Sequence, residues 1–365
     1  MMRIKKPELL LTLDSMKDPN TGFYYFGKAL FGHINKHNQG RFKLNYYIKD
    51  KSGFFSKGLA LYHLYKFHKV FFPFFYRFDI VHFSDQNCRL RPWKVLGKKV
   101  LTIHDLNQLH QPGYSDDFKK KYKLKLAKCI RYCDKVIAIS NFVADDVRRN
   151  FPESADKISV IYNGADDLTV APDFKPAYIP RKKFLFTLGP LNEKKNFHVL
   201  PSLLKDNDYE MVISGITPVL AYKELLLAEA EKYGASNRIQ ITGPISDDEK
   251  AWYYKNCSAF LFPSLAEGFG LPVLEAMAFG KPVFLSDKTS LPEIGGDEAF
   301  YFKSFEPADM QSVFKNGMDK FEKEQMAGKC IARAAQFSWD KTAFNYLGLY
   351  QELLSETIAK TGASA

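Results

Sequence analysis

The stretch from Pro263 to Pro282 reads PSLAEGFGLPVLEAMAFGKP and carries most of the information about the fold. The apolar run at 259–262, directly before it, predicts a buried parallel strand, and the Gly-Phe-Gly sequence at 268–270 predicts a tight loop. Pro272 suits the first helical position, where a backbone amide hydrogen is not needed. The segment therefore predicts a helix start whose free amides form a natural anion site.

Two carboxylates flank this predicted anion site. Glu267 stands just before the turn, and Glu275 follows in the helix with seven residues between the two. Carboxylates only accept hydrogen bonds, so they suit sugar hydroxyls, and a phosphate-binding helix start beside them is what a nucleotide-sugar site requires. An ordinary strand–turn–helix with solvated acids explains the spacing of the two glutamates equally well on its own.

The whole segment PSLAEGFGLPVLEAMAFGKPV resembles the donor-site signature of retaining GT-B glycosyltransferases of the family 4 type, almost residue for residue. The resemblance covers essentially the whole chain and is most specific in 183–302. It implies two Rossmann-like parallel-sheet domains that face a cleft. It also implies transfer of a hexosyl group from a nucleotide-sugar donor to an acceptor hydroxyl, with retention at the anomeric carbon.

Length and hydrophobic pattern fit this architecture. A chain of 365 residues suits two domains, and strand-like runs alternate with helix-length segments, as in an α/β fold. The predicted strands are 8–13, 42–48, 80–83, 100–104, 135–139, 158–162, 184–188, 210–214, 238–242, 259–262, 282–285 and 299–302. The proline-containing stretch 165–183 is the predicted linker. We expect an acceptor-binding domain at 1–170, a donor-binding domain at 171–340, and a crossover helix with a tail at 341–365.

In the predicted donor domain, the strand at 184–188 ends in Gly189 and leads to Lys194 and Lys195. A glycine lets a ligand approach the backbone, and a lysine can meet a phosphate. The resemblance implies that Lys195 grips the donor diphosphate. Many family members carry an arginine soon after the glycine, but this chain has Pro190 there, so that contact is either absent or supplied by Lys194.

The resemblance also assigns roles around the glycine loop. Glu275 is expected at the ribose hydroxyls, and Glu267 at the hydroxyls of the donor sugar and the positive charge that builds on its ring. The other donor-binding residues expected are Gly215, Gly243, Gly268, Phe269, Gly270 and Leu271. The acids near the predicted site are not spaced as a metal cage, so we expect no metal and no cofactor, with Lys195 and the helix amides stabilising the leaving diphosphate.

In the predicted acceptor domain, His104 and Asp105 end a buried strand. A histidine at such a place is more often a structural hydrogen-bonding residue, but the resemblance implies that His104 lines the reaction centre. Gly22 starts a predicted helix and resembles the family's N-terminal glycine loop, which approaches donor or acceptor; a simple turn is the alternative.

Charge is uneven along the chain. Residues 1–170 hold 30 Lys and Arg against 16 Asp and Glu, a balance of +14, whereas the remainder holds 22 against 25, a balance of −3. This indicates an anionic partner for the first half: a membrane surface, a phosphorylated acceptor or nucleic acid. The basic, aromatic segment Lys57–Arg77 fits either a membrane-interfacial stretch or a core helix with a buried Phe-rich turn. Five cysteines without metal-site spacing fit free thiols in a reducing cytoplasm.

The sequence favours mannose from GDP-mannose as donor, because the 189–196 segment looks more like mannosyl- or rhamnosyl-transferring relatives. The expected acceptor is a glycan or lipid-linked intermediate of surface polysaccharide or lipopolysaccharide assembly, at the cytoplasmic face of a membrane. A UDP-sugar-dependent transferase is the nearest alternative. An inactive transferase scaffold that binds an anionic surface or nucleic acid is the alternative from another class, although no nucleic-acid-binding motif is present.

Overall fold

The computed structural model describes residues 6–16, 21–49, 55, 59–69, 72, 76–165 and 168–362. The chain divides into two compact units, which we describe separately: unit 1 comprises 1–164 together with 339–365, and unit 2 comprises 165–338. The sequence placed these boundaries at 170/171 and 340/341, so the predicted linker 165–183 lies within unit 2.

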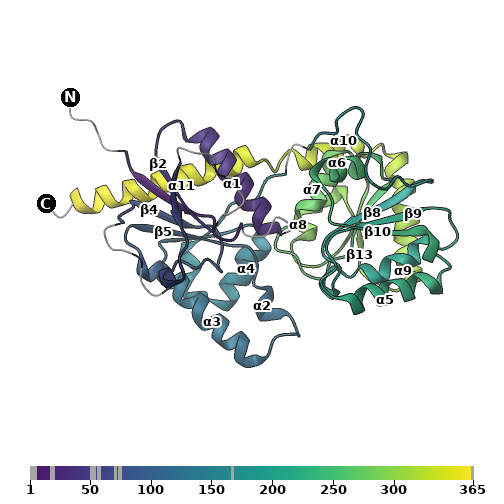
Figure 1. The fold of residues 1–365 in the computed structure, drawn as a ribbon, viewed down its shortest axis with the longest axis horizontal. Helices are drawn as coiled ribbons and strands as arrows, with labels where there is room; N and C mark the ends of the chain where they lie inside the picture. Colours follow the sequence, from purple (N-terminus) through teal and green to yellow (C-terminus); the bar gives the residue numbers. More distant parts are fainter. Residues whose placement is uncertain are drawn as a thin grey trace. The chain divides into compact units, whose positions relative to one another are not determined.

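Unit 1 is built on a seven-stranded parallel sheet of order β3-β2-β1-β4-β5-β6-β7 (Figure 1). Its strands are β1 (Glu8–Thr12), β2 (Lys43–Ile48), β3 (Ala60–His63), β4 (Ile80–Phe83), β5 (Lys98–Ile103), β6 (Lys135–Ala138) and β7 (Ile158–Val160). Its helices are α1 (Gly22–Asn38), α2 (Asn107–His110), α3 (Asp116–Arg131), α4 (Asn141–Asn150) and α11 (Trp339–Gly362), with 3-10 turns η1 (Lys66–Lys69), η2 (Pro92–Lys94) and η3 (Pro152–Lys157). The chain runs outward from β1 to β2 and β3 on one side, then returns to β4 on the other side of β1 and continues to β7. With right-handed crossovers, this reversal places α1 on one face of the sheet and α3 and α4 on the other.

Unit 2 is built on a six-stranded parallel sheet of order β10-β9-β8-β11-β12-β13. Its strands are β8 (Phe184–Leu188), β9 (Glu210–Ser214), β10 (Ile239–Gly243), β11 (Ala259–Phe262), β12 (Val283–Ser286) and β13 (Phe300–Phe302). Its helices are α5 (Leu220–Lys232), α6 (Asp247–Asn256), α7 (Leu271–Ala278), α8 (Leu291–Gly295), α9 (Pro307–Lys323) and α10 (Ala327–Ala334), with 3-10 segments η4 (Glu193–Lys195), η5 (Phe197–Leu204), η6 (Ser236–Arg238) and η7 (Gly296–Glu298). Figure 1 shows α5 and α9 on one face of this sheet and α6, α7 and α10 on the other, so apolar strands such as Ala259–Phe262 are buried from both sides.

The expected double Rossmann-like architecture is confirmed, and each of the twelve predicted strands is present within a residue or two of its predicted ends. One strand was missed. The segment 57–77 holds β3 and η1, so the core-helix interpretation is wrong for 60–69. Contact of this segment with a membrane interface stays a prediction. Residues 57–58, 70–71 and 73–75 of this segment lie outside the described part of the chain.

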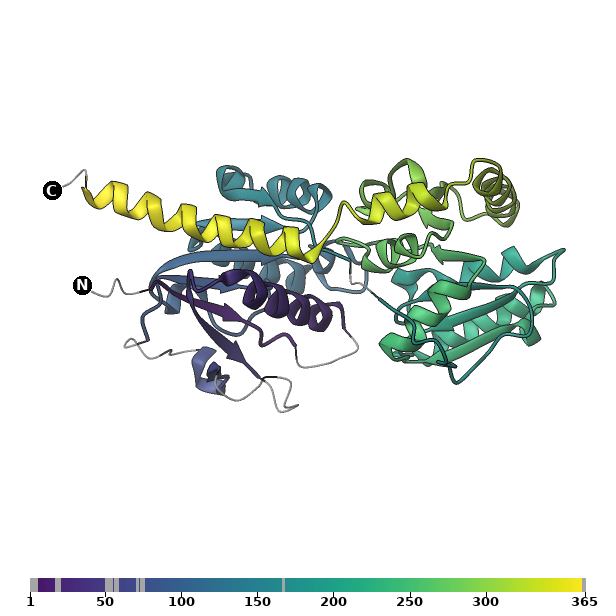
Figure 2. The same cartoon turned by 90° about the horizontal axis from the view of Figure 1, so that it is seen from above.

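The C-terminal helix α11 belongs to unit 1, as predicted, and lies beside α1 (Figure 2). A chain of buried hydrogen bonds attaches it to the sheet. The Tyr350 hydroxyl lies 2.6 Å from His82 Nδ1, His82 Nε2 lies 2.8 Å from Thr102 Oγ1, and that hydroxyl lies 2.8 Å from the Tyr346 hydroxyl. Burial lowers the pKa of His82 to about 3, so the ring is neutral and donates from one nitrogen while it accepts at the other.

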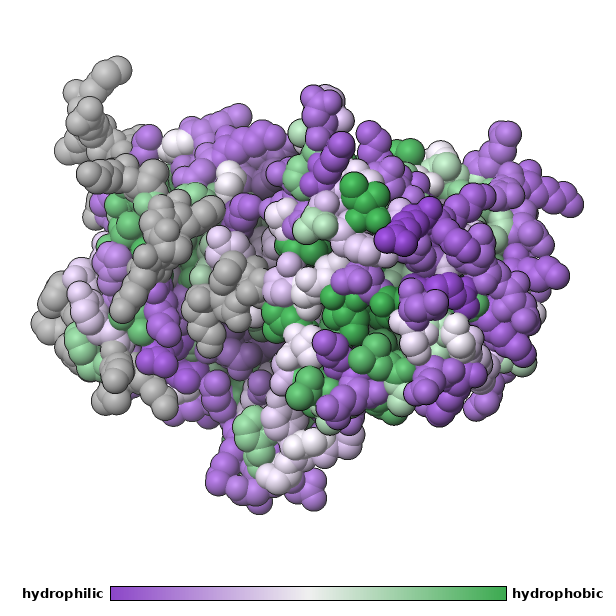
Figure 3. Space-filling model, turned by 45° about the vertical axis from the view of Figure 1, so that its right-hand side comes forward, coloured by the Kyte–Doolittle hydropathy of each residue, from purple (hydrophilic) through white to green (hydrophobic). Residues whose placement is uncertain are grey.

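Among the described residues, no helix combines the length and the apolar character that a bilayer crossing requires. On the face drawn in Figure 3, hydrophilic residues dominate and the hydrophobic ones gather in small separate patches. All five cysteines are buried free thiols.

The buried chain at α11 yields a stability prediction. Tyr350→Phe removes only the hydroxyl and leaves a buried nitrogen of His82 unpaired, so we expect unfolding in urea to become easier by about 1–3 kcal/mol. Tyr132→Phe is the matched control, because Tyr132 is 46% exposed and should change the unfolding free energy by less than about 0.5 kcal/mol. Equal urea midpoints for the two variants would show that these buried hydrogen bonds do not hold α11 on the sheet.

Candidate functional site

The first candidate site lies in unit 2, where the direction of the strand order reverses. The chain passes from β8 to β9 on one side of the sheet and later returns to β11 on the other side of β8. Ligands of open α/β sheets bind beyond the carboxyl ends of the strands at such a switch point. The loops after β8 and β11 carry Lys195 and Glu267, two residues that the sequence singled out.

Lys195 and Glu267 form a buried ion pair. Lys195 Nζ lies 2.6 Å from Glu267 Oε1, and their side chains are 9% and 13% exposed. Lys195 Nζ also lies 4.4 Å from the centre of the Phe262 ring, a cation–π contact at the end of β11. Loops that follow adjacent strands thus place one positive and one negative group side by side at the sheet edge.

Each charge holds the other in its ionised form. Burial and the neighbouring Lys194 lower the pKa of Lys195, and the carboxylate of Glu267 opposes them. Burial pulls the pKa of Glu267 upward, but Lys195 and Lys194 outweigh it, so the pKa lies below its ordinary value. Lys194 is half-buried, and its carbonyl accepts from the Leu265 amide at 2.8 Å, which ties the two loops together.

Two glycines at this edge have packing reasons for being glycine. Gly189 has a φ of 148°, and a Cβ atom there would lie 2.9 Å from Lys195 Cε. Because glycine has no Cβ, the side chain of Lys195 can cross the end of β8. Gly215 has a φ of 142°, and a Cβ atom there would lie 2.0 Å from the Gly189 carbonyl oxygen. Gly243 also has a positive φ, 77°, and its carbonyl accepts from the Gly215 amide at 2.8 Å. These three glycines therefore shape the ends of neighbouring strands β8, β9 and β10.

The glycine loop before α7 is fixed by two residues that follow β12. The Thr289 hydroxyl accepts from the Glu267 amide at 2.9 Å. The buried Ser290 hydroxyl lies 3.0 Å from the Glu267 carbonyl oxygen and 2.9 Å from that of Phe269. Gly268 and Phe269 are buried in this loop, and Gly270, with a φ of 111°, directly precedes the first helical residue, Leu271. The role of Ser290 in holding this loop was not among the predictions from the sequence.

Glu275 lies where the sequence placed it, one turn into α7, but its carboxylate already has two partners. Lys250 Nζ donates to Oε1 and the Tyr254 hydroxyl donates to Oε2, both at 2.8 Å and both from α6. Glu275 and Lys250 are each 6% exposed. A carboxylate has about four acceptor positions, so two remain. The ribose role of Glu275 stays a prediction, and the structure adds a second role, packing α7 against α6.

The second candidate site is the corresponding edge of unit 1, where β1 and β4 meet. His104, at the end of β5, is 8% exposed, and its Nε2 donates to the Ser84 carbonyl at 2.8 Å. The rings of Phe23 and Phe26 contact it edge-on. Burial lowers the pKa of His104, so the ring is neutral with its proton on Nε2. No hydrogen bond to Nδ1 is found within the described ranges of the chain.

Asp105 and Gly22 have simpler surroundings. The Asp105 carboxylate accepts at 3.1 Å from the backbone amide of Asn107, the first residue of the short helix α2. Gly22 is the first residue of α1, and a Cβ atom there would meet no described atom within 4 Å. The predicted ligand contacts of Gly22 and Asp105 stay predictions.

Sequence analysis missed a pair of buried acids at this edge. Asp14 follows β1 and Asp85 follows β4, and they are 7% and 2% exposed. Asp14 accepts from the Cys88 thiol and the Arg89 amide, both at 2.9 Å, whereas Asp85 Oδ2 has no partner among the described residues. Burial and the nearby Asp85 raise the pKa of Asp14 from 3.8 to about 6. The signal that could have found Asp14 is its place directly after the first strand.

Comparison with known proteins identifies the chain. The model of glycosyl transferases group 1 matches residues 173–337, and that of glycosyltransferase family 4 matches 38–167. The chain belongs to glycosyltransferase family 4. The family assignment that the Pro263–Pro282 segment indicated is therefore confirmed.

The relatives of this family 4 glycosyltransferase include named mannosyltransferases. The serotype-specific mannosyltransferase WbdA of Escherichia coli is 31% identical over 292 residues, which are 73% of this chain and 34% of WbdA. The chain thus matches about a third of the length of that relative. The O-antigen chain mannosyltransferase B of Escherichia coli is 25% identical over 278 residues, 71% of each chain.

Solved structures confirm the GT-B fold. Sucrose-phosphate synthase from Thermosynechococcus elongatus aligns with a TM-score of 0.75 at 16% identity, over 96% of this chain and 100% of that one. Anabaena HepE in complex with UDP-glucose aligns with a TM-score of 0.66 at 17% identity, over 96% and 100% of the two chains. At these identities the likeness concerns the fold alone.

The Lys250–Glu275 pair of this glycosyltransferase yields a second stability prediction. Lys250→Met leaves the Glu275 carboxylate buried without its cation, and we expect a loss of about 3–5 kcal/mol in unfolding free energy. Adding Glu275→Gln removes the orphaned charge and should recover part of that loss. Lys255→Met, at an exposed position of the same helix, is the control. A loss of the same size in the double variant as in Lys250→Met would contradict the pairing.

The raised pKa of Asp14 yields a prediction of pH dependence. The folded state binds a proton on the Asp14 carboxyl more tightly than the unfolded state does. The free energy of unfolding therefore falls as the pH rises from about 4 to about 6 and this carboxyl loses its proton. Asp14→Asn has no charge to bury. The melting temperature of Asp14→Asn minus that of wild type should therefore increase between pH 4 and pH 6 and stay constant at higher pH. The total increase should correspond to about 3 kcal/mol of unfolding free energy. Melting curves of both proteins from pH 4 to 8 test this, and a constant difference would refute it.

Proposed function

We propose that this glycosyltransferase transfers a hexosyl group from a nucleoside diphosphate sugar to a hydroxyl of a glycan or lipid-linked acceptor, with retention and without a metal ion. The observation that carries the proposal is the buried Lys195–Glu267 pair at the switch point of unit 2. It offers a cation for the diphosphate and, next to it, a carboxylate for the sugar.

The ammonium group of Lys195 can donate to Glu267 and to the donor diphosphate at the same time. It has three donors, of which one goes to Glu267, so two can contact phosphate oxygens. A donor whose diphosphate lies on Lys195 then has its sugar beside Glu267. Lys194, half-buried next to it, adds positive charge where Pro190 stands in place of the family's arginine.

In the proposed reaction, charge develops at two places, on the leaving diphosphate and on the sugar ring. The bond between the anomeric carbon and the phosphate oxygen breaks, and a bond from that carbon to the acceptor oxygen forms on the same face. The hydroxyl proton of the acceptor passes to the leaving phosphate. Lys195 stabilises the charge that develops on the diphosphate, and Glu267 the positive charge that develops on the sugar ring. The lysine charge supplies what a metal ion supplies in other transferases.

The relatives guide the choice of donor and acceptor. WbdA and mannosyltransferase B are named mannosyltransferases, and the latter acts on the O-antigen chain. We therefore favour mannose from GDP-mannose, and a role in bacterial surface polysaccharide assembly. The fold's likeness to HepE, solved with UDP-glucose, keeps a UDP-sugar as the second candidate.

A basic and aromatic surface of unit 1 supports an acceptor presented at the cytoplasmic face of a membrane. Lys128 Nζ lies 4.4 Å from the centre of the Trp93 ring, and Tyr132 packs beside that ring. Lys94 and Arg131, from the same two segments, are exposed. Cations near an anionic lipid surface add about 1 kcal/mol each, and aromatic rings suit the interface. We expect no nucleic-acid partner.

The test is sugar transfer and thermal stabilisation with GDP-, UDP-, ADP- and dTDP-sugars. We expect one nucleotide series to raise the melting temperature by several degrees at about 100 times its Kd. Lys195→Met should lower turnover by about 100-fold or more, because it removes the charge at the leaving group. Lys205→Met, an exposed lysine of the same unit, is the control.

Because Lys195→Met leaves Glu267 buried and alone, the double variant with Glu267→Gln tests activity in a protein without that orphaned charge. Wild-type turnover in the double variant would reject the proposed site. Absence of stabilisation by every nucleotide sugar would reject the proposed donor class.

A further inference from the structure

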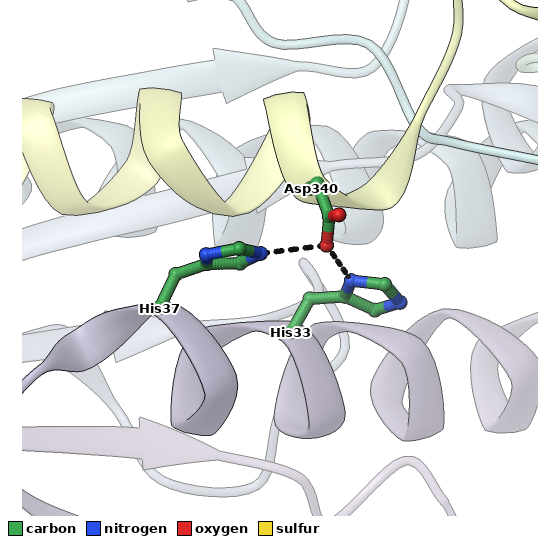
Figure 4. Close-up of side chains that lie close together, drawn as sticks. All are labelled: His33, His37 and Asp340. Carbon is green, nitrogen blue, oxygen red and sulfur yellow. Dashed lines mark hydrogen bonds and ion pairs between the residues drawn. The ribbon is translucent and has the colours of Figure 1, made fainter.

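Three side chains outside both candidate sites converge where α1 packs against α11 (Figure 4). His33 and His37 lie one turn apart on α1, and Asp340 lies in the first turn of α11. His33 Nδ1 is 2.5 Å and His37 Nε2 is 2.6 Å from the same oxygen, Asp340 Oδ1. We call these three residues the α1–α11 cluster.

The donor set of the cluster is that of a transition-metal site. Two imidazole nitrogens and one carboxylate oxygen are ligands that zinc and related divalent ions prefer. The three ligand atoms all lie within 4.8 Å of one another. Tetrahedral zinc with bonds of about 2.0–2.1 Å holds its ligand atoms about 3.3 Å apart. The two nitrogen–oxygen distances, 2.5 and 2.6 Å, would therefore need to grow by less than about 1 Å, and the two nitrogens, at most 4.8 Å apart, would need to approach each other by up to about 1.5 Å.

The surroundings allow an ion to enter. The side chains of His33, His37 and Asp340 are 32%, 13% and 41% exposed, which leaves an open side for a water ligand. One charged neighbour is Lys36, with its Nζ 2.9 Å from Asp340 Oδ2, and another is Arg41, which donates to the His37 carbonyl at 3.0 Å. The side chain of Lys36 is 59% exposed and can turn into solvent when a cation binds. The Phe344 ring, 4.3 Å from that of His37, holds this imidazole in place.

We propose that the α1–α11 cluster binds one divalent transition-metal ion, with zinc as the best-suited ion. His33 Nδ1, His37 Nε2 and the Asp340 carboxylate are the protein ligands, and water completes the tetrahedron. The ion links the helix that opens unit 1 to the helix that closes it. His33 stands eleven residues along α1 from Gly22, about 16 Å, so the ion is structural and takes no part in sugar transfer.

The experiment is a titration of the full chain, stripped with a chelator, with Co²⁺ followed by absorption and with Zn²⁺ followed by calorimetry. We expect one equivalent of Co²⁺ to give the intense visible bands of a tetrahedral site, and Zn²⁺ to raise the melting temperature by several degrees. His33→Gln, His37→Gln and Asp340→Asn should each weaken zinc binding at least about tenfold.

His110→Gln is the matched control, because His110 is a second histidine paired with an aspartate, 2.7 Å from Asp146, outside the cluster. It should leave metal binding unchanged. Melting curves with chelator present show whether each variant is folded, and Asp340→Asn preserves the shape of the carboxylate. Zinc affinity that is equal in wild type and in the three cluster variants would overturn the proposal. So would a wild-type melting temperature that zinc does not change, because the cluster would then be held by hydrogen bonds alone.

Discussion

The ion pair between Lys195 and Glu267 is the interaction on which the arrangement of unit 2 depends. Two charges buried at the edge of a sheet are stable only together, because each offsets the desolvation of the other. Their approach needs the loops after β8 and β11 to meet, and this requires Gly189 beneath the lysine stem and the Leu265–Lys194 backbone bond between the loops. The glycine loop, the glycine-lined strand ends and the start of α7 are arranged around this pair.

The two units use the same sheet order for different electrostatic purposes. In unit 2 the switch point carries two lysines and one glutamate, whose surplus of positive charge suits an anionic ligand. The corresponding edge of unit 1 carries Asp14, Asp85 and a neutral His104, all buried, and this set suits neutral hydroxyl groups as hydrogen-bonding partners. The side chains of the two units are therefore compatible with the proposed division between a unit for the phosphorylated donor and a unit for a hydroxyl acceptor.

The strands could be predicted because each is a short apolar run bounded by turn residues, a pattern that depends on few neighbours. β3 could not, because its sequence ALYH is partly exposed and lies among aromatic residues that fit a helix equally well. In the site, the position of Lys195 followed from its place after a strand, but its partner did not, since Glu267 is 72 residues away. The engagement of Glu275 by Lys250 and Tyr254 was invisible for the same reason: nothing in a local motif indicates which helix packs against it.

Unit 2 comprises 165–338 and interrupts the sequence of unit 1, which ends at 164 and resumes at 339. Its first and last residues, Ala165 and Ser338, pair in an isolated β-bridge. Unit 2 is therefore an insertion whose two ends are held together, within a unit 1 that is discontinuous in sequence. During synthesis, unit 2 has all its residues available before α11 has been made, whereas the sheet of unit 1 lacks part of the cover on its α1 face until that last helix arrives. Unit 2 can therefore complete its core before unit 1 can, although unit 1 begins earlier in the chain.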